Sequence, residues 1–193
     1  MSKIENRDIL QRCHLFQTKE KKVRKTIFAV VLGIGLLCNA AISIAAEDKA
    51  TPEEVYDKVV KAAAVIEQLG SEGLTALNDT KEFIWKDSYV WAVNCVDKTV
   101  AAHPDKKYIG LDITKIYDKN EDPAKRKMHN VELCAGAQNP YGVWVEYWWE
   151  KLGSEKPARK ISFMIQVPGQ PYAVTAGIYD EKTTIETLEK TMY

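Results

Sequence analysis

Apolar residues recur at helical spacing in the first part of the chain that follows residue 46. One stripe at this spacing is formed by Val55, Val59, Val60, Ala63, Ile66 and Leu69. Thr51 can cap the helix and Pro52 stands at its first position, so the pattern predicts an amphipathic helix that buries one face. Gly70 ends or bends this helix, and we expect a second short helix that reaches Asn78.

Beyond residue 87 the pattern changes to the alternation that is typical of β-strands. The first alternating segment places four side chains on one face, namely Tyr89, Trp91, Val93 and Cys95. Further strands are expected at 142–149, 160–167 and 171–180, with short turns between them. The remaining expected elements are a turn at 97–100, a loop at 101–113, a short helix at 123–134 and a closing helix or tail at 181–190.

This order of elements predicts the fold class. Strands joined by short turns pair as antiparallel neighbours, and helices that are segregated from such a sheet make an α+β domain. We therefore expect a long N-terminal helix packed on an antiparallel β-sheet, in one domain that spans residues 47–193.

Residues 1–46 differ from the domain, and their composition predicts an extension followed by a signal peptide. Basic residues up to Lys25 precede an uncharged stretch from Thr26 to Ala46, which resembles the apolar core of a signal peptide. Cleavage is expected after Ala45 or Ala46. Two alternatives stay open: an uncleaved inner-membrane anchor through residues 24–46, and a lipid-modified Cys38.

Charge and motifs exclude several classes of function. Residues 47–193 carry nineteen Lys and Arg against twenty-four Asp and Glu, so they offer no basic surface for nucleic acid. The sequence has no HExxH, CxxC or GxSxG motif and no phosphate-binding loop. His103 and His129 are the two histidines of this region, which is weak support for a metal site. We expect that the protein is not an enzyme and that it binds neither a cofactor nor a metal.

The two cysteines of the domain predict a disulfide. Cys95 and Cys134 form an even pair in a chain that is expected to be exported to an oxidising compartment. Two independent buried thiols are the alternative, because sequence alone does not show that the pair comes within bonding distance.

A dense aromatic run, YGVWVEYWWEK at 141–151, indicates where a ligand could bind. On a strand, Tyr147 and Trp149 face one way while Trp144 and Trp148 face the other, so neither face is simply exposed to water. One face can pack against the N-terminal helix, and the other is then covered or lines a cavity. Tyrosine and tryptophan supply flat apolar walls with one polar atom each, which suits a small ligand, although rings of a core are the alternative.

The chain resembles the single Cache domain, the PAS-like extracytoplasmic sensor of bacterial chemoreceptors and histidine kinases. The resemblance covers nearly all of residues 47–193 and rests on six motifs in order: Tyr89–Val93, Ala102–Pro104, Gly110, Trp144–Tyr147, Lys160 and Gly177–Tyr179. Two positions depart from the family pattern. Val143 is inserted after the displaced Gly142, and Lys98 with Thr99 replaces the usual turn glycine.

The resemblance implies a periplasmic or secreted sensory protein that binds a small organic acid and acts in, or beside, signal transduction and chemotaxis. The ligand-binding residues that we expect are Trp91, His103, Trp144, Tyr147, Lys160 and Tyr172. Lys160 would supply the charge for a carboxylate. Trp144 and Tyr147 lie on opposite faces by strict alternation, and we expect the displaced glycine to mark a bulge that brings them together.

Three kinds of partner are expected: the small ligand, a membrane receptor or kinase, and a second copy bound through the N-terminal helix. The alternative function is an interaction module without a ligand, in which the aromatic rings are core and the long helix pairs with a partner.

The first prediction concerns export. Mass spectrometry of the protein from periplasmic extract should find Ala46 or Glu47 at the N-terminus, because these residues follow the expected cleavage sites. Recovery from the membrane fraction alone, with residues 24–46 intact, would show an anchor instead.

Overall fold

The computed structural model describes residues 49–79 and 81–192. The expected signal peptide, the anchor alternative and Cys38 lie outside the described residues. The helices are α2 (Pro52–Leu69), α3 (Ser71–Asp79), α4 (His129–Gly136) and α5 (Ile185–Met192). The strands are β1 (Ile84–Trp85), β2 (Ser88–Asn94), β3 (Thr99–Ala102), β4 (Val143–Glu150), β5 (Pro157–Gln166) and β6 (Tyr172–Ile178). Short 3-10 turns lie at Lys81–Phe83, Lys106–Tyr108, Ile113–Lys115 and Pro123–Lys125.

The long helix begins as the sequence predicts. The Thr51 hydroxyl accepts a hydrogen bond from the Glu54 amide at 3.3 Å, and the Glu54 carboxylate accepts one from the Thr51 amide at 3.0 Å. This capping box satisfies two amides that the first turn leaves unpaired. The buried stripe contains Val55, Val59, Ala62, Ala63 and Ile66. Leu69 was predicted to continue the stripe, but it lies at the last turn and is 47% exposed.

All strands pair antiparallel in one sheet with the order β1-β2-β6-β5-β4, and β3 also pairs with β2. The expected α+β class is confirmed, and so are the four strands that the alternation predicted. The short strands β1 and β3 were not predicted. The sequence predicts a turn and a loop over the segment of β3, because four residues carry too little alternation to indicate a strand.

Two further expectations about local structure are wrong. The helix expected at 123–134 is a 3-10 turn at Pro123–Lys125 followed, after a break, by α4. The bulge expected near Gly142 is absent from β4, which pairs with β5 in unbroken register from Val143 to Glu150. The irregularity instead lies in the pairing of β2 with β3, between Ala92 and Val93.

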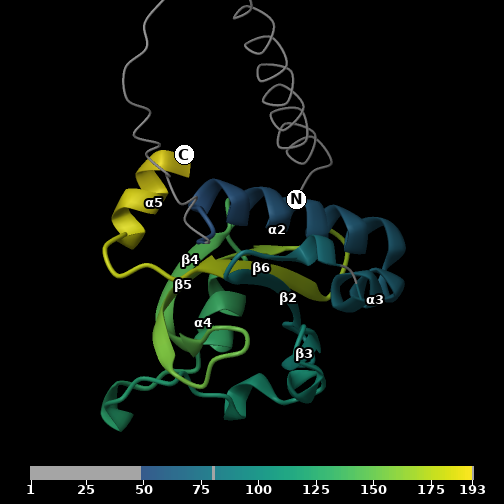
Figure 1. Ribbon diagram of the computed structural model, residues 1–193. Helices are drawn as coiled ribbons and strands as arrows, with labels where there is room; N and C mark the ends of the chain where they lie inside the picture. The colour runs from purple at the N-terminus through teal and green to yellow at the C-terminus, as the bar shows by residue number, and fades with distance from the viewer. Residues whose placement is uncertain (1–48, 80, 193) are drawn as a thin grey trace, which may run out of the picture. The chain divides into compact units, whose positions relative to one another are not determined.

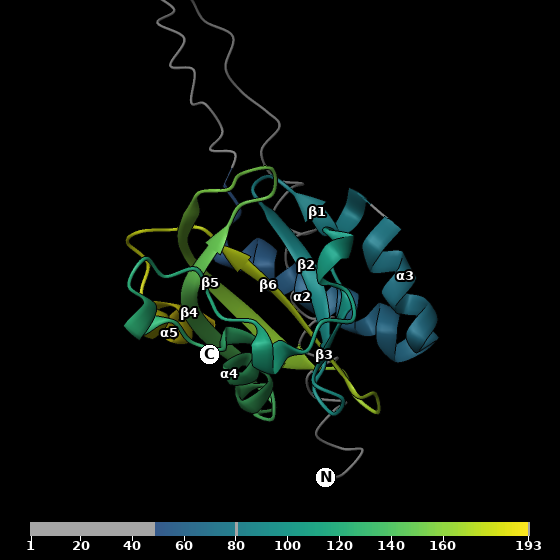
Figure 2. The ribbon, with the colours of Figure 1, turned by 90° about the horizontal axis from the view of Figure 1, so that it is seen from below.

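The sheet separates two hydrophobic cores. Figure 1 shows α2 and α3 on one side of the sheet and α4 with the segment around β3 on the other, and Figure 2 views the sheet from the side of α4. The core under α2 includes Val90, Trp144 and Phe163. The core on the α4 side includes Tyr89, Trp91, Val93, Tyr147 and Trp149. Alternation along β2 and β4 thus sends successive side chains to different cores.

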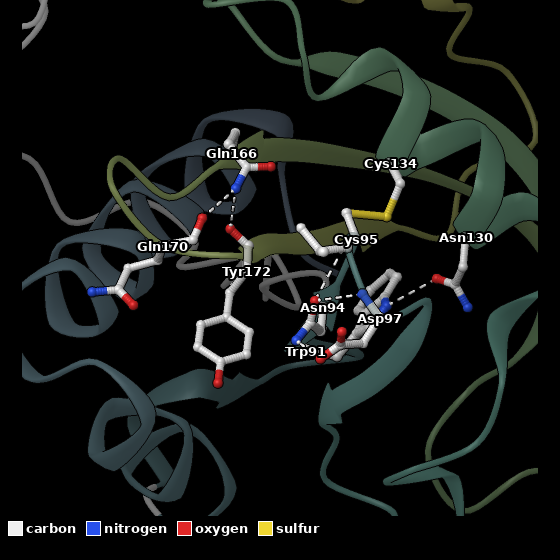
Figure 3. Close-up of a disulfide and its surroundings, with 10 residues drawn as sticks. Trp91, Asn94, Cys95, Asp97, Asn130, Cys134, Gln166, Gln170 and Tyr172 are labelled. Atoms are coloured by element: carbon white, nitrogen blue, oxygen red, sulfur yellow. Dashed lines mark hydrogen bonds between the residues drawn. A yellow bond between two sulfur atoms is a disulfide. The ribbon is translucent and has the colours of Figure 1, made fainter.

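A disulfide joins the two sides of the second core. Cys95 follows β2, Cys134 lies in α4, and their Cα atoms are 5.6 Å apart (Figure 3). The predicted pairing is confirmed, and it ties α4 to the strand that carries Tyr89 and Trp91.

The second prediction concerns this bond. The cysteines are 39 residues apart, so a closed loop of this length is worth about 3–4 kcal/mol in the chain-entropy account. Without reductant, the Cys95→Ser/Cys134→Ser double variant should lose about this much free energy of unfolding, measured by urea titration. With reductant, the double variant and the parent should unfold at the same urea concentration, because the parent then lacks the bond as well. Equal stability without reductant would contradict the prediction.

Candidate functional site

A small cavity lies under the face of the sheet that α2 does not cover. Its volume is about 20 Å³ for the centre of a water-sized sphere, which is room for one or two water molecules. It is lined mostly by rings, and the complete lining is Tyr89, Trp91, Val100, His103, Tyr108, Ile116, His129, Asn130, Tyr147 and Trp149. No acidic residue belongs to this lining.

Lys160 lies beside the cavity with its amine over the aromatic wall. Its side chain is fully buried, and Nζ lies 3.9 Å from the ring centre of Tyr89 and 4.6 Å from that of Trp91. The ring of Tyr179 lies 4.8 Å from Nζ. No described protein group accepts a hydrogen bond from this amine. A buried donor without an acceptor is costly, so Lys160 is a strong indication of a site.

Gly177 lets Lys160 reach that wall. Lys160 is on β5 and Tyr89 is on β2, with β6 between them. A Cβ at Gly177 of β6 would collide with the Ser162 hydroxyl and would lie 2.7 Å from the Ile161 carbonyl oxygen and 3.0 Å from Lys160 Cε. The lysine side chain therefore passes over β6 at Gly177, the position where this strand has no side chain.

His103 forms part of the wall on the β3 side. Its Nδ1 lies 3.0 Å from the Asp105 amide nitrogen and 3.2 Å from the Asp105 carbonyl oxygen, so Nδ1 accepts from the amide in one tautomer and donates to the carbonyl in the other. Its ring packs against Tyr89 and Tyr108 at centroid distances of 5.1 and 4.8 Å. Burial, followed by the charge of Lys160, lowers the pKa of His103 to about 4. His103 is therefore a neutral donor at neutral pH.

The first turn of α4 forms the opposite wall. His129 stacks on Tyr147 with ring centres 4.2 Å apart, and Asn130 Oδ1 accepts a hydrogen bond from Trp91 Nε1 at 3.3 Å (Figure 3). Burial, followed by the charge of Lys160, lowers the pKa of His129 to about 3. Its Nδ1 is buried without a hydrogen-bond partner in the described residues. The disulfide lies farther along the same helix and holds this wall in place.

Two opposing effects act on the charge of Lys160. Facing rings favour an ammonium group by about 0.5–2 kcal/mol each, and Asp87 adds a weaker favourable charge. Removal of the amine from water disfavours the charged form by several kcal/mol. Burial is the larger effect and lowers the pKa of Lys160 well below its ordinary value.

The tyrosine hydroxyls near the amine stay protonated. Burial raises the pKa of Tyr89, of Tyr147 and of Tyr179. Tyr147 shares a hydrogen bond of 2.8 Å with the Ser162 hydroxyl, and the Tyr179 hydroxyl donates to the Glu150 carbonyl at 2.6 Å. Neutral phenols and neutral imidazoles thus belong to the lining, and the amine of Lys160 lies over two of its rings. Groups of this kind can donate hydrogen bonds to an anion.

The structure brings together four of the six residues that the sequence proposed for ligand binding. Trp91, His103 and Tyr147 line the cavity, and Lys160 lies over the ring of Trp91. Trp144 and Tyr172 do not reach this place. Both pack in the core under α2, because strict alternation along β4 and β6 directs them away from the cavity.

Sequence reasoning missed several residues of the wall. Trp149 shares the face of Tyr147 and Tyr89 shares the face of Trp91, so alternation could have included both. His129 was noted only as a histidine without metal partners, and its place at the start of α4 depends on how that helix packs. In residues 49–79 and 81–192, no group of three or more potential metal ligands occurs.

The family is established by comparison with known proteins. The profile described as Cache domain matches residues 49–184, so the chain belongs to the Cache domain family and the resemblance seen in its motifs is confirmed. A search of curated proteins finds no match.

Solved structures of chemotaxis proteins share the fold. A methyl-accepting chemotaxis protein from Vibrio parahaemolyticus RIMD 2210633 is 16% identical with a TM-score of 0.55, over 67% of this chain and 88% of that chain. A periplasmic sensor domain of a chemotaxis protein is 23% identical with a TM-score of 0.51, over 67% and 90%. A Cache chemosensory domain studied for carboxylic acid recognition is 20% identical with a TM-score of 0.53, over 67% and 92%. At these identities the likeness shows the fold alone.

The third prediction tests the crossing of Lys160 over β6. Gly177→Ala should lower the free energy of unfolding by about 1–3 kcal/mol, because the new methyl group meets the fixed Ile161 carbonyl as well as flexible side chains. Thermal unfolding measures the effect. Adding Ser162→Ala removes the contact with the hydroxyl and should recover only part of the loss; unfolding of Gly177→Ala at the parent temperature would contradict the geometry.

Proposed function

We propose that this protein is an extracytoplasmic sensory domain that binds a small monocarboxylate in the cavity beside Lys160. One observation carries the proposal: a fully buried amine, with no acceptor among the described residues, lies over two rings of a cavity whose lining has no acidic residue. A carboxylate would give Lys160 the partner that the protein does not supply.

The shape and chemistry of the cavity favour a ligand of few heavy atoms. The walls are aromatic, and the space between them admits one or two water molecules with the side chains as they stand. Tyr108 is the half-buried ring of the wall, on a short turn after β3, and its displacement would enlarge the space. Acetate, propionate and pyruvate are ligands of this size class.

The polar groups also disfavour other classes of ligand. An amino acid carries an ammonium group, which would need a carboxylate that the lining does not contain. A dicarboxylate would need a second cation, and the buried charged groups among the described residues include Lys160 as their only lysine or arginine. A monocarboxylate is matched to the single amine.

The family and the disulfide indicate the compartment in which the domain works. Cache domains serve as sensors outside the cytoplasm, and the bond between Cys95 and Cys134 suits an oxidising compartment. Within the described part of the chain, no helix has the length and apolarity to cross a membrane. We infer a place in or beside chemotaxis or related signalling, with a membrane receptor or kinase as the partner.

The fourth prediction tests the ligand site. A thermal-shift series with acetate, propionate and pyruvate should raise the unfolding temperature of the parent. A ligand present at 100 times its dissociation constant adds about 2.7 kcal/mol to the free energy of unfolding. Lys160→Met should weaken binding about ten- to a hundredfold, which corresponds to one or two charge-assisted hydrogen bonds. Lys160→Arg should recover little, because the planar fork does not fit the space of a point charge.

A matched control distinguishes the loss of the amine at the site from the loss of a positive charge elsewhere on the protein. Lys156 is exposed and precedes β5, so Lys156→Met removes the same charge at the surface and should bind like the parent. Lys160→Met should keep or raise the unfolding temperature without ligand, because it removes a buried group that has no acceptor. Equal affinity of Lys160→Met and parent would exclude this site. A stable fold with no carboxylate bound would favour the interaction module instead.

A further inference from the structure

We propose that the cavity binds its carboxylate together with one proton, so that the species recognised is in effect the undissociated acid. This inference rests on the proposed function, and it concerns how the site responds to pH. It follows from the surroundings of Lys160, which contain rings and neutral groups but no acceptor for the amine.

The neighbours of Lys160 come from every element that packs around it. β2 contributes Tyr89, β4 contributes Tyr147, and Tyr179 follows β6, and all three are phenols with pKa values raised by burial. The β3 segment and α4 contribute His103 and His129, whose pKa values are lowered. None of these five groups carries a negative charge at neutral pH.

One carboxylate acts on the amine from the turn between β1 and β2, but another lysine already holds it. Asp87 Oδ2 accepts a hydrogen bond from Lys151 Nζ at 2.8 Å, and Asp87 Oδ1 accepts one from the Ala50 amide at 2.9 Å. Asp87 raises the pKa of Lys160, whereas burial lowers it by more. In the free protein, burial therefore shifts Lys160 toward the neutral amine.

A carboxylate in the cavity reverses this balance. The ligand anion arrives from water, a proton from the solvent adds to the lone pair of Lys160 Nζ, and the product is an ammonium–carboxylate pair; no other bond changes. The pair is net neutral, so it can stay in a dry cavity where either charge alone is costly. The bound ligand thus raises the pKa of the amine.

The two histidines are poorer proton acceptors than the lysine. Burial, followed by the charge of Lys160, lowers the pKa of His103 to about 4, and the backbone of Asp105 offsets only part of this effect. His129 is stacked on Tyr147 inside the core. A lysine amine is the more basic group in water by about four pKa units, and all three groups share the same dry surroundings. The proton therefore goes to Lys160.

The sign of the pH dependence follows. The pKa of Lys160 is lowered in the free protein and raised in the complex, so binding takes up a proton between these two values. Within that window the affinity falls about tenfold for each unit by which pH rises. Below the free-protein value the amine is already charged, binding takes up no proton at Lys160, and the titration of Lys160 no longer makes the affinity depend on pH. The sensor would respond more strongly to the same amount of carboxylate as the medium becomes acidic.

Titration calorimetry tests the proposal with acetate and propionate as probes. The protein is titrated at about pH 8 in phosphate and in Tris, whose enthalpies of ionisation differ greatly. The dependence of the binding heat on the buffer gives the number of protons taken up, and about one proton per ligand is expected. Carbon-13 labelling of lysine Cε reports the charge of Lys160 directly, with Lys160→Met used to assign its signal.

Different results would contradict the proton uptake and the proposed binding of a carboxylate. A buffer-dependent heat, together with a Lys160 signal that changes from amine to ammonium when acetate is added, supports the inference. Acetate that binds with the same heat in both buffers, or a Lys160 that is already charged without ligand, overturns the inference and leaves the proposed ligand class intact. Failure of every short monocarboxylate to shift the unfolding temperature overturns the proposed function, and the inference with it.

Discussion

The burial of one lysine amine over aromatic rings is the constraint on which the site depends. Lys160 has no exposed surface and finds no acceptor in the part of the chain that the structure describes, so the fold gives up a solvated charge at this position. The rings of Tyr89 and Trp91 return a part of that free energy. A well-packed apolar side chain would cost less, which is why the lysine is better explained by a ligand than by stability.

The geometry that permits this burial involves three neighbouring strands. The side chain leaves β5, passes over β6 at Gly177 and ends above β2, so register between the strands decides whether the amine meets the rings. A slip of one residue in β6 would place the side chain of Ala176 or Ile178 at the position of Gly177, in the path of the lysine. The unbroken pairing of β5 with both of its neighbours thus positions Lys160 over the rings.

Sequence patterns predicted what alternation and composition control. The capped helix α2, the four longer strands and the disulfide follow from local spacing, and the faces of β2 and β4 follow from period two. The side of the sheet that holds the cavity did not follow, because aromatic residues occupy both faces of β4. Trp144 and Tyr147 were grouped by family resemblance, whereas alternation already separated them. Where the fold and the resemblance disagreed, the local physical rule was the better guide.

The walls of the cavity are held with unequal strength, and this bears on how a ligand could reach the amine. The α4 wall is fixed by the disulfide to the end of β2, by the Asn130–Trp91 hydrogen bond and by the stacking of His129 on Tyr147. The Tyr108 side chain is half-buried and packs on His103 and Trp149 through its ring. Rotation of the half-buried Tyr108 ring disturbs fewer contacts than movement of α4, which the disulfide holds to the end of β2. Access past Tyr108 would leave Lys160, Tyr89 and Trp91 in place, so that the amine meets the carboxylate in a site that is already formed.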